Sequence, residues 1–184
     1  MMIHSKRFGS IEVREDRIIK VEDGLLGFAH LKQFVLADDP HDISMPFKWL
    51  ISIEEPDVVF LVTDPGIFFK DYVFDLPPEE GKRIDAKSED DVSVITILTV
   101  PADPKQITAN LRGPLVINWR TLVGRQIILK DTEYTTKHYI FIQKTGANDG
   151  AKGSSSGVTE TSVDTLTTSA SSATAMKDVA TSRN

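Results

Sequence analysis

The chain has 184 residues, 40% hydrophobic and 26% charged, and this composition is typical of a soluble globular protein. It has no cysteine, which excludes disulfides and thiolate metal sites and suits a reducing, cytoplasmic environment. No apolar run approaches the roughly 20 residues that span a bilayer, and the first residues (MMIHSKRFGSIEV) lack the apolar stretch of a signal peptide, so we expect no membrane or secreted protein. With 21 basic and 27 acidic residues the net charge is −6, which disfavours nucleic-acid phosphates and favours a basic partner.

The first 144 residues alternate between short apolar segments and turn-forming residues, a pattern typical of strands. The sequence FGSI at 8–11 predicts a hairpin turn, and GLLGF at 24–28 interrupts the chain. The predicted strands are residues 17–21, 34–36, 49–53, 58–62, 92–100, 115–118, 126–129 and 134–142. Two short helical turns are expected at 65–70 and 77–83. About ten short strands with so little helix predict an all-β fold, a small antiparallel β-barrel or a sandwich.

The composition changes near residue 144. From 151 to 184, 15 of 34 residues are Ser or Thr and none is aromatic, so this stretch cannot bury enough apolar surface to fold. The run GAKGSSSG at 150–157 has the composition of a flexible linker, either natural or an artificial junction. We therefore expect a barrel domain over residues 1–144 and a disordered Ser/Thr-rich tail over residues 145–184.

Signatures of catalysis are missing from the sequence. No glycine-rich phosphate loop and no HxxxH or HExxH spacing occurs. Two acidic clusters are candidate sites: Asp38, Asp39, His41 and Asp42, and Glu54, Glu55 and Asp57. The first could bind a divalent cation but has ordinary turn chemistry, and the second could be an acid–base pair but flanks a proline in a turn. We expect no catalytic residue, no metal, no cofactor and no small-molecule substrate.

Nucleic-acid binding by an OB-like barrel is the main alternative function. Five aromatic residues could stack on bases: Phe60, Phe68, Phe69, Tyr72 and Phe74. That function also needs a positive groove, whereas the basic residues here are scattered among acids. Core packing or a protein interface is the favoured interpretation of these aromatics.

The segment TANLRGPLVINWR at 108–120 is the most distinctive one. Gly113 and Pro114 fix a bend between two strand-like pieces, so residues 108–112 are predicted to lie at a rim of the barrel with an unpaired strand edge. Asn110 and Asn118 either cap this turn or reach outward to the backbone of a partner.

Several collinear blocks resemble the FliW family of flagellar assembly factors. They are GSIEV from residue 9, GLLGF from 24, PFKWLISIEEPDVVFLVTDP at 46–65, DY at 71–72 and TANLRGPLVINWRTLVGRQIIL at 108–129. The last block is similar to the family's TVNLxxPIVIN motif, with Ala109, Gly113 and Trp119 as departures.

The resemblance implies a non-enzymatic β-barrel with two protein partners, flagellin and the basic RNA-binding repressor CsrA. In this scheme the protein binds CsrA and relieves repression of flagellin synthesis, and flagellin competes for it by negative linkage. In an organism without CsrA only the flagellin role would remain. The candidate partner-binding residues are Thr108, Asn110, Leu111, Pro114, Asn118, Asp64, Asp71 and Tyr72.

Overall fold

The structure of the chain is a computed structural model that describes residues 1–39 and 44–141. Three sequence predictions lie outside these residues: the tail at 145–184, the end of the 134–142 strand, and the place of His41 and Asp42 in the acidic cluster.

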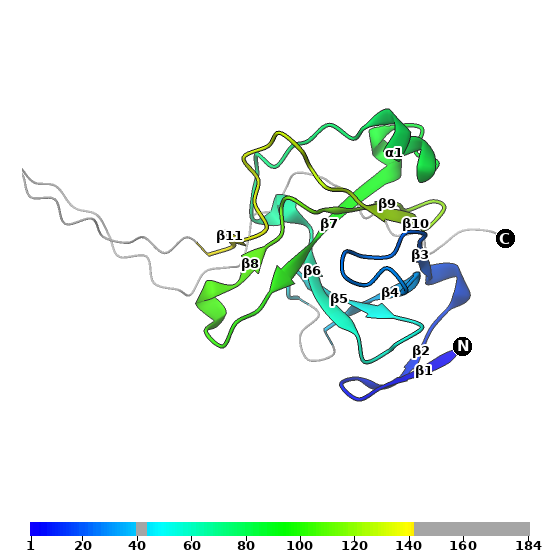
Figure 1. Cartoon of the computed structure of the whole chain (residues 1–184). Helices are drawn as coiled ribbons and strands as arrows, with labels where there is room; N and C mark the ends of the chain where they lie inside the picture. The colour runs from blue at the N-terminus through cyan, green and yellow to red at the C-terminus, as the bar shows by residue number, and fades with distance from the viewer. Residues whose placement is uncertain (40–43, 142–184) are drawn as a thin grey trace, which may run out of the picture. The chain divides into compact units, whose positions relative to one another are not determined.

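The described residues form eleven short strands and little helix (Figure 1). The strands are β1 (Met2–Ser5), β2 (Gly9–Glu12), β3 (Ile19–Val21), β4 (Gln33–Asp38), β5 (Phe47–Ser52), β6 (Val59–Thr63), β7 (Val92–Thr99), β8 (Thr108–Ala109), β9 (Leu115–Asn118), β10 (Val123–Gln126) and β11 (His138–Tyr139). The helical elements are the 3-10 turns η1 (Glu15–Arg17), η2 (Pro65–Ile67), η3 (Glu89–Asp91) and η4 (Pro104–Gln106), and one α-helix, α1 (Pro78–Arg83).

Seven strands close into a barrel in the order β7-β6-β5-β4-β3-β10-β9, because β7 also pairs with β9. The long β7 makes this closure possible. Its first half pairs with β9, and its second half pairs with β6 and β8. Strand β8 in turn carries β11, so the two form a short extension beside the barrel. The prediction of a small all-β barrel is confirmed.

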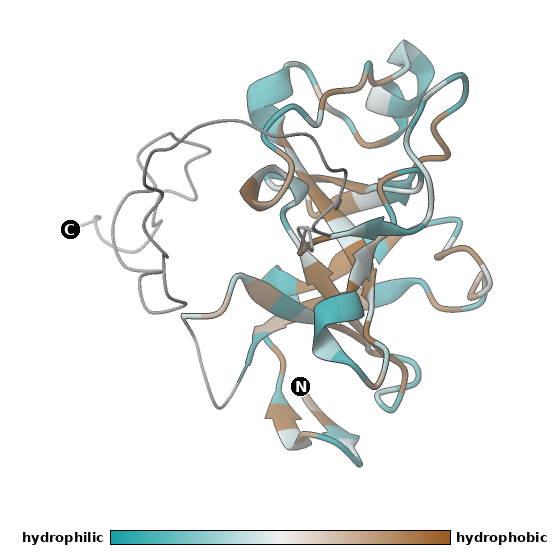
Figure 2. Ribbon diagram, turned by 90° about the vertical axis from the view of Figure 1, so that its left-hand side faces the viewer, coloured by the Kyte–Doolittle hydropathy of each residue, from teal (hydrophilic) through white to brown (hydrophobic). Residues whose placement is uncertain are grey.

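Strands β5, β7 and β9 are buried or half-buried over almost their whole length, which explains their largely apolar sequences. On β5, Leu50 packs in the cluster that contains Phe34 and Leu115, whereas its neighbour Ile51 packs against the β1–β2 hairpin through Ile3. Hydrophobic residues accordingly run along the barrel strands, and hydrophilic residues mark many of the loops and α1 (Figure 2). The hairpin therefore acts as a cover for the outer face of the β4–β6 sheet.

Gly24 holds the GLLGF segment in place. Its φ is +70°, and a Cβ at this position would lie 2.6 Å from the carbonyl oxygen of Phe28 and 2.8 Å from that of Leu31. Only glycine combines this left-handed conformation with such close backbone approach.

Several sequence predictions were wrong in detail. The predicted hairpin turn at 8–11 is mostly strand β2, and the turn lies just before it, because Gly9 with φ +69° already pairs with Ser5. The barrel is not wholly antiparallel, since β10 pairs in parallel with β3. The predicted strand at 126–129 is shifted to Val123–Gln126, and the helical turns shorten to Pro65–Ile67 and Pro78–Arg83.

Candidate functional site

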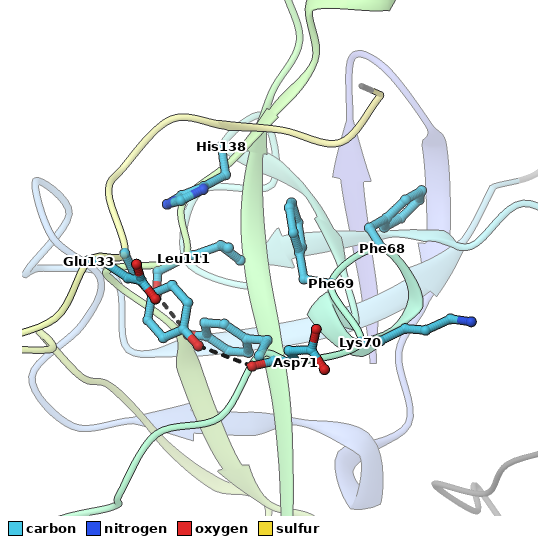
Figure 3. Close-up of a pocket in the computed structure, with 9 residues that line it drawn as sticks. Phe68, Phe69, Lys70, Asp71, Leu111, Glu133 and His138 are labelled. Carbon is cyan, nitrogen blue, oxygen red and sulfur yellow. Dashed lines mark hydrogen bonds between the residues drawn. The ribbon is translucent and has the colours of Figure 1, made fainter. Parts of the chain in front are cut away.

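An open pocket of about 380 Å³ lies beside the barrel, where three segments distant in sequence meet (Figure 3). It is lined by residues 68–72, which follow η2, by Leu111, and by Glu133, Tyr134 and His138 near the C-terminal end of the described chain. We call this the aromatic pocket.

The η2 turn sets the direction of the first segment. The Asp64 carboxylate accepts a hydrogen bond from the Gly66 backbone N–H at 2.8 Å, and Pro65 occupies the first position of the turn. The turn continues through bonds from Phe69 N to Pro65 O and from Tyr72 N to Phe69 O. These bonds bring Phe69 and Tyr72 against the β8 extension, in the cluster that contains Leu98 and Leu111.

Aromatic rings form the walls of the pocket. The Tyr72 and Tyr134 ring centroids are 4.7 Å apart, His138 lies 6.0 Å from Phe69, and it lies 6.2 Å from Tyr134. Hydrogen bonds of their hydroxyl groups hold the two tyrosine rings in place. The Tyr72 hydroxyl donates to Leu111 O at 2.7 Å, and the Tyr134 hydroxyl lies 3.2 Å from both the N–H and the carbonyl oxygen of Val73.

Two polar groups of the pocket, the Tyr72 hydroxyl and His138 Nε2, already have hydrogen-bond partners within the chain. Burial raises the pKa of the Tyr72 hydroxyl well above its usual value, and the neighbouring Tyr134 raises it further, so this hydroxyl stays neutral and bound to Leu111. The Nε2 atom of His138 accepts a hydrogen bond from Thr135 N at 2.8 Å.

The charged groups of the pocket lie at its mouth. The side chains of Asp71 and Glu133 are exposed, and neither carboxylate has a hydrogen-bond or ion-pair partner among residues 1–39 and 44–141. The Lys70 side chain points away from His138 and Glu133 (Figure 3). The mouth of the pocket is therefore negative.

Of the first acidic cluster only Asp38 and Asp39 lie in the described ranges, where they bond the Lys48 ammonium and the Trp49 indole N–H, and the second cluster is bonded within the fold. Both oxygens of Glu54 accept backbone N–H groups, from Lys32 and Gln33, while Glu55 pairs with His30 at 3.1 Å. Asp57 pairs with Lys6, whose backbone N–H lowers the pKa of the Asp57 carboxyl. Within the described ranges no group of three His, Asp or Glu side chains is placed to hold a metal ion.

The structure brings together three of the predicted partner-binding residues, Asp71, Tyr72 and Leu111. Asp64 lies seven residues earlier in the chain, as the cap of η2. The other four, Thr108, Asn110, Pro114 and Asn118, do not line the pocket.

The expectation of an unpaired strand edge at 108–112 was wrong. Thr108 and Ala109 pair on one side with β7 and on the other with β11, and both are buried. Leu111 is 1% exposed, so a substitution there cannot leave the fold untouched. The strand is paired because β11, a segment that the sequence did not connect to it, returns alongside.

Of the two alternatives for the asparagines, the structure supports turn capping. Asn110 Oδ1 accepts from Gly113 N at 3.0 Å. Asn118, which is 1% exposed, donates to the carbonyl oxygens of Ile84 and Asp85 and accepts from Arg120 N. Both therefore hold backbone turns within the chain.

The aromatics considered for base stacking do not form one platform. Phe60 packs in the barrel core against Phe28, at 5.1 Å between centroids, and Phe74 joins the cluster that contains Val116. Phe68 stacks on Phe47 at 5.8 Å. Only Phe68, Phe69 and Tyr72 reach the aromatic pocket.

Sequence reasoning missed Glu133, Tyr134 and His138 as site residues. It assigned Tyr134 and His138 to a strand at 134–142 and gave Glu133 no role. The polar run DTEYTTKH at 131–138 and the φ of +51° at Asp131 are signs of a loop, and the regular strand is limited to His138–Tyr139.

In the described residues, no helix is long and apolar enough to cross a bilayer. A closed seven-stranded barrel with an aromatic pocket beside it defines a small all-β barrel protein.

The comparisons with known proteins give the family. The FliW protein family model matches residues 2–140. The chain is 39% identical over 140 residues to the flagellar assembly factor FliW of Bacillus subtilis, covering 76% of this chain and 96% of that protein. It is 40% identical over 142 residues to the flagellar assembly factor FliW of Natranaerobius thermophilus, covering 77% of this chain and 93% of that protein.

The fold agrees with a solved structure of the same family. A crystal structure described as the flagellar assembly factor FliW superimposes with a TM-score of 0.73 at 37% identity, covering 78% of this chain and 99% of that one. The chain belongs to the FliW family, and its role is in flagellar assembly.

Proposed function

We propose that this chain is a non-catalytic, cytoplasmic regulator that binds flagellin and, in alternation, a basic RNA-binding repressor of the CsrA type. Membership of the FliW family is the observation that carries the proposal. A mutually exclusive pair of partners would couple flagellin synthesis to export, because each partner lowers the affinity of the chain for the other.

The charge of the chain supports a basic partner. Residues 1–144 contain 23 acidic and 18 basic residues, and several of the basic ones are already paired within the described fold. Asp71 and Glu133 add two carboxylates without partners in the described ranges, beside exposed aromatic surface. Such a surface favours association with a positive protein and makes the association sensitive to salt.

The test is a calorimetric titration of the repressor into the chain at low and at high salt. We expect affinity to fall markedly with salt, and we expect the double variant Asp64→Asn with Asp71→Asn to associate more slowly than the unmodified chain. Asparagine is as good a cap as aspartate, so the η2 turn survives the first change.

The matched control is Asp16→Asn with Asp103→Asn, which removes the same charge from exposed sites in η1 and beside η4. Affinity that does not change with salt, or equal slowing in both double variants, would contradict the role of Asp64 and Asp71. Failure to bind either the repressor or flagellin would contradict the proposed function.

A further inference from the structure

We propose that the aromatic pocket receives an arginine side chain from a polypeptide partner. The inference deepens the proposed function and rests on it only in taking the partner to be a protein.

The pocket offers ring faces and carboxylates, and few other groups are free to bind a ligand. The Tyr72 hydroxyl is bound to Leu111 O, the Tyr134 hydroxyl to the backbone at Val73, and His138 Nε2 to Thr135 N. These bonds fix the orientation of the rings and occupy both hydroxyl groups and His138 Nε2. What remains for a ligand is aromatic surface and the second ring nitrogen of His138 within the pocket, and negative charge at its mouth.

This combination selects a cation. A positive group over an aromatic face is attracted by the ring quadrupole, and a carboxylate beside it adds direct electrostatic attraction. Asp71 and Glu133 come from segments 62 residues apart in sequence, yet both line the same pocket (Figure 3). Lys70 is the one cationic side chain of the described residues that lines the pocket, and it points away from His138 and Glu133.

Arginine fits this pocket better than lysine. The guanidinium is flat, weakly hydrated and able to stack on an aromatic ring while it bonds to a carboxylate through its edge. An ammonium is strongly hydrated, and a pocket this open cannot replace its water shell. The volume of about 380 Å³ admits a long side chain.

The surroundings favour a polypeptide over a free amino acid. Phe141, which is 45% exposed, packs edge-on against the pocket residue Phe68, with 6.4 Å between the ring centroids. Large apolar side chains next to a pocket provide contact area for residues on either side of the inserted arginine.

The experiment is a titration of the isotope-labelled full chain with three acetylated, amidated tripeptides, Gly-X-Gly, followed by amide chemical shifts. X is arginine, lysine or citrulline, the last being a neutral analogue with the shape of arginine. We expect the arginine peptide to shift the amides of residues 69–72 and 133–138 and to bind about fivefold more tightly than the citrulline peptide, as for an exposed cation–π contact with an added carboxylate. The lysine peptide should bind more weakly than the arginine peptide.

The variant Asp71→Asn with Glu133→Gln should lose the preference for arginine over citrulline. Asp75→Asn with Glu89→Gln is the matched control, because it makes the same two changes at exposed sites outside the pocket. Equal binding of arginine and citrulline, equal binding of arginine and lysine, shifts elsewhere on the barrel, or equal losses in both double variants would each overturn the proposal.

The two proposals fail separately. If the chain binds flagellin or the repressor and the pocket variant binds that partner equally well, the pocket is not where the partner's arginine enters. If the arginine peptide binds the pocket but the chain binds neither protein, the proposed function fails and the pocket assignment stands.

Discussion

Replacing Leu111 by alanine tests the structural role of the segment that the sequence placed at an exposed rim. The Leu111 side chain is 1% exposed and packs in the cluster that contains Leu98, Ile107 and Ile140. The substitution removes three buried carbon atoms, which corresponds to about 2.4 kcal/mol of transfer free energy. The cavity left behind adds to this loss, so we expect the free energy of unfolding to fall by about 3 kcal/mol.

The assay is equilibrium unfolding in urea, followed by tryptophan fluorescence. Ile128→Ala is the matched control: Ile128 is 53% exposed, and truncating it should change the free energy of unfolding by less than about 0.5 kcal/mol. The assignment of Leu111 to the core would be refuted if Leu111→Ala lowered the free energy of unfolding by less than about 1 kcal/mol while its dependence on urea concentration stayed unchanged.

Four further predictions follow from particular residues. Asn118→Ala should destabilise the chain by about 3 kcal/mol, because it removes a buried side chain that bonds Ile84, Asp85 and Arg120; a thermal melt within error of the unmodified chain would contradict this. Gly24→Ala should cost more than about 2 kcal/mol in a urea titration, since the new Cβ would meet backbone atoms; an unchanged midpoint would show that the segment can shift. A hydrogen bond from Lys87 N and the positive charge of the nearby Arg120 hold the pKa of the Asp91 carboxyl below its usual 3.8. The ionised Asp91 therefore contributes its full stabilisation above pH 3.8, and this stabilisation is lost as the pH falls from 3.8 through the lower pKa of the folded state. Asp91→Asn should make the melting temperature fall less steeply as the pH is lowered from 6 to 2. An unchanged fall would mean that other carboxylates cause it. Removing residues 145–184 should leave the melting temperature unchanged, because the four core clusters found among the described residues lie between Ile3 and Ile140; a lower melting temperature would make the tail part of the fold.

The class of fold could be predicted because burial on both faces leaves a direct mark on the sequence. The run VSVITILTV at 92–100 is almost entirely apolar or β-branched, and Ile95 and Leu98 of β7 pack in two different clusters. The shift of β10 has a physical cause as well. Ile127 and Leu129 are buried and flank an exposed Ile128, so the segment has strand periodicity, but their N–H groups bond to Pro114 O and Arg112 O beyond the end of the ladder.

The candidate site could be predicted only in part. Asp71 and Tyr72 were found because they form a recognisable local pair in the family pattern. Tyr134 and His138 complete the pocket from more than 60 residues away, and no local periodicity connects them to Tyr72. The parallel pairing of β10 with β3 is a similar case, since it depends on barrel closure between distant segments. Contacts of this kind depend on tertiary packing, which a single sequence does not specify by spacing.

The most direct test of the central claim is a competition measurement with the full chain. The affinity for the repressor would be measured at increasing concentrations of flagellin, and the affinity for flagellin at increasing concentrations of the repressor. We expect each partner to lower the affinity of the chain for the other by the same factor, as reciprocity of binding free energies requires. Binding of both partners at once with unchanged affinities, or binding of neither, would contradict it.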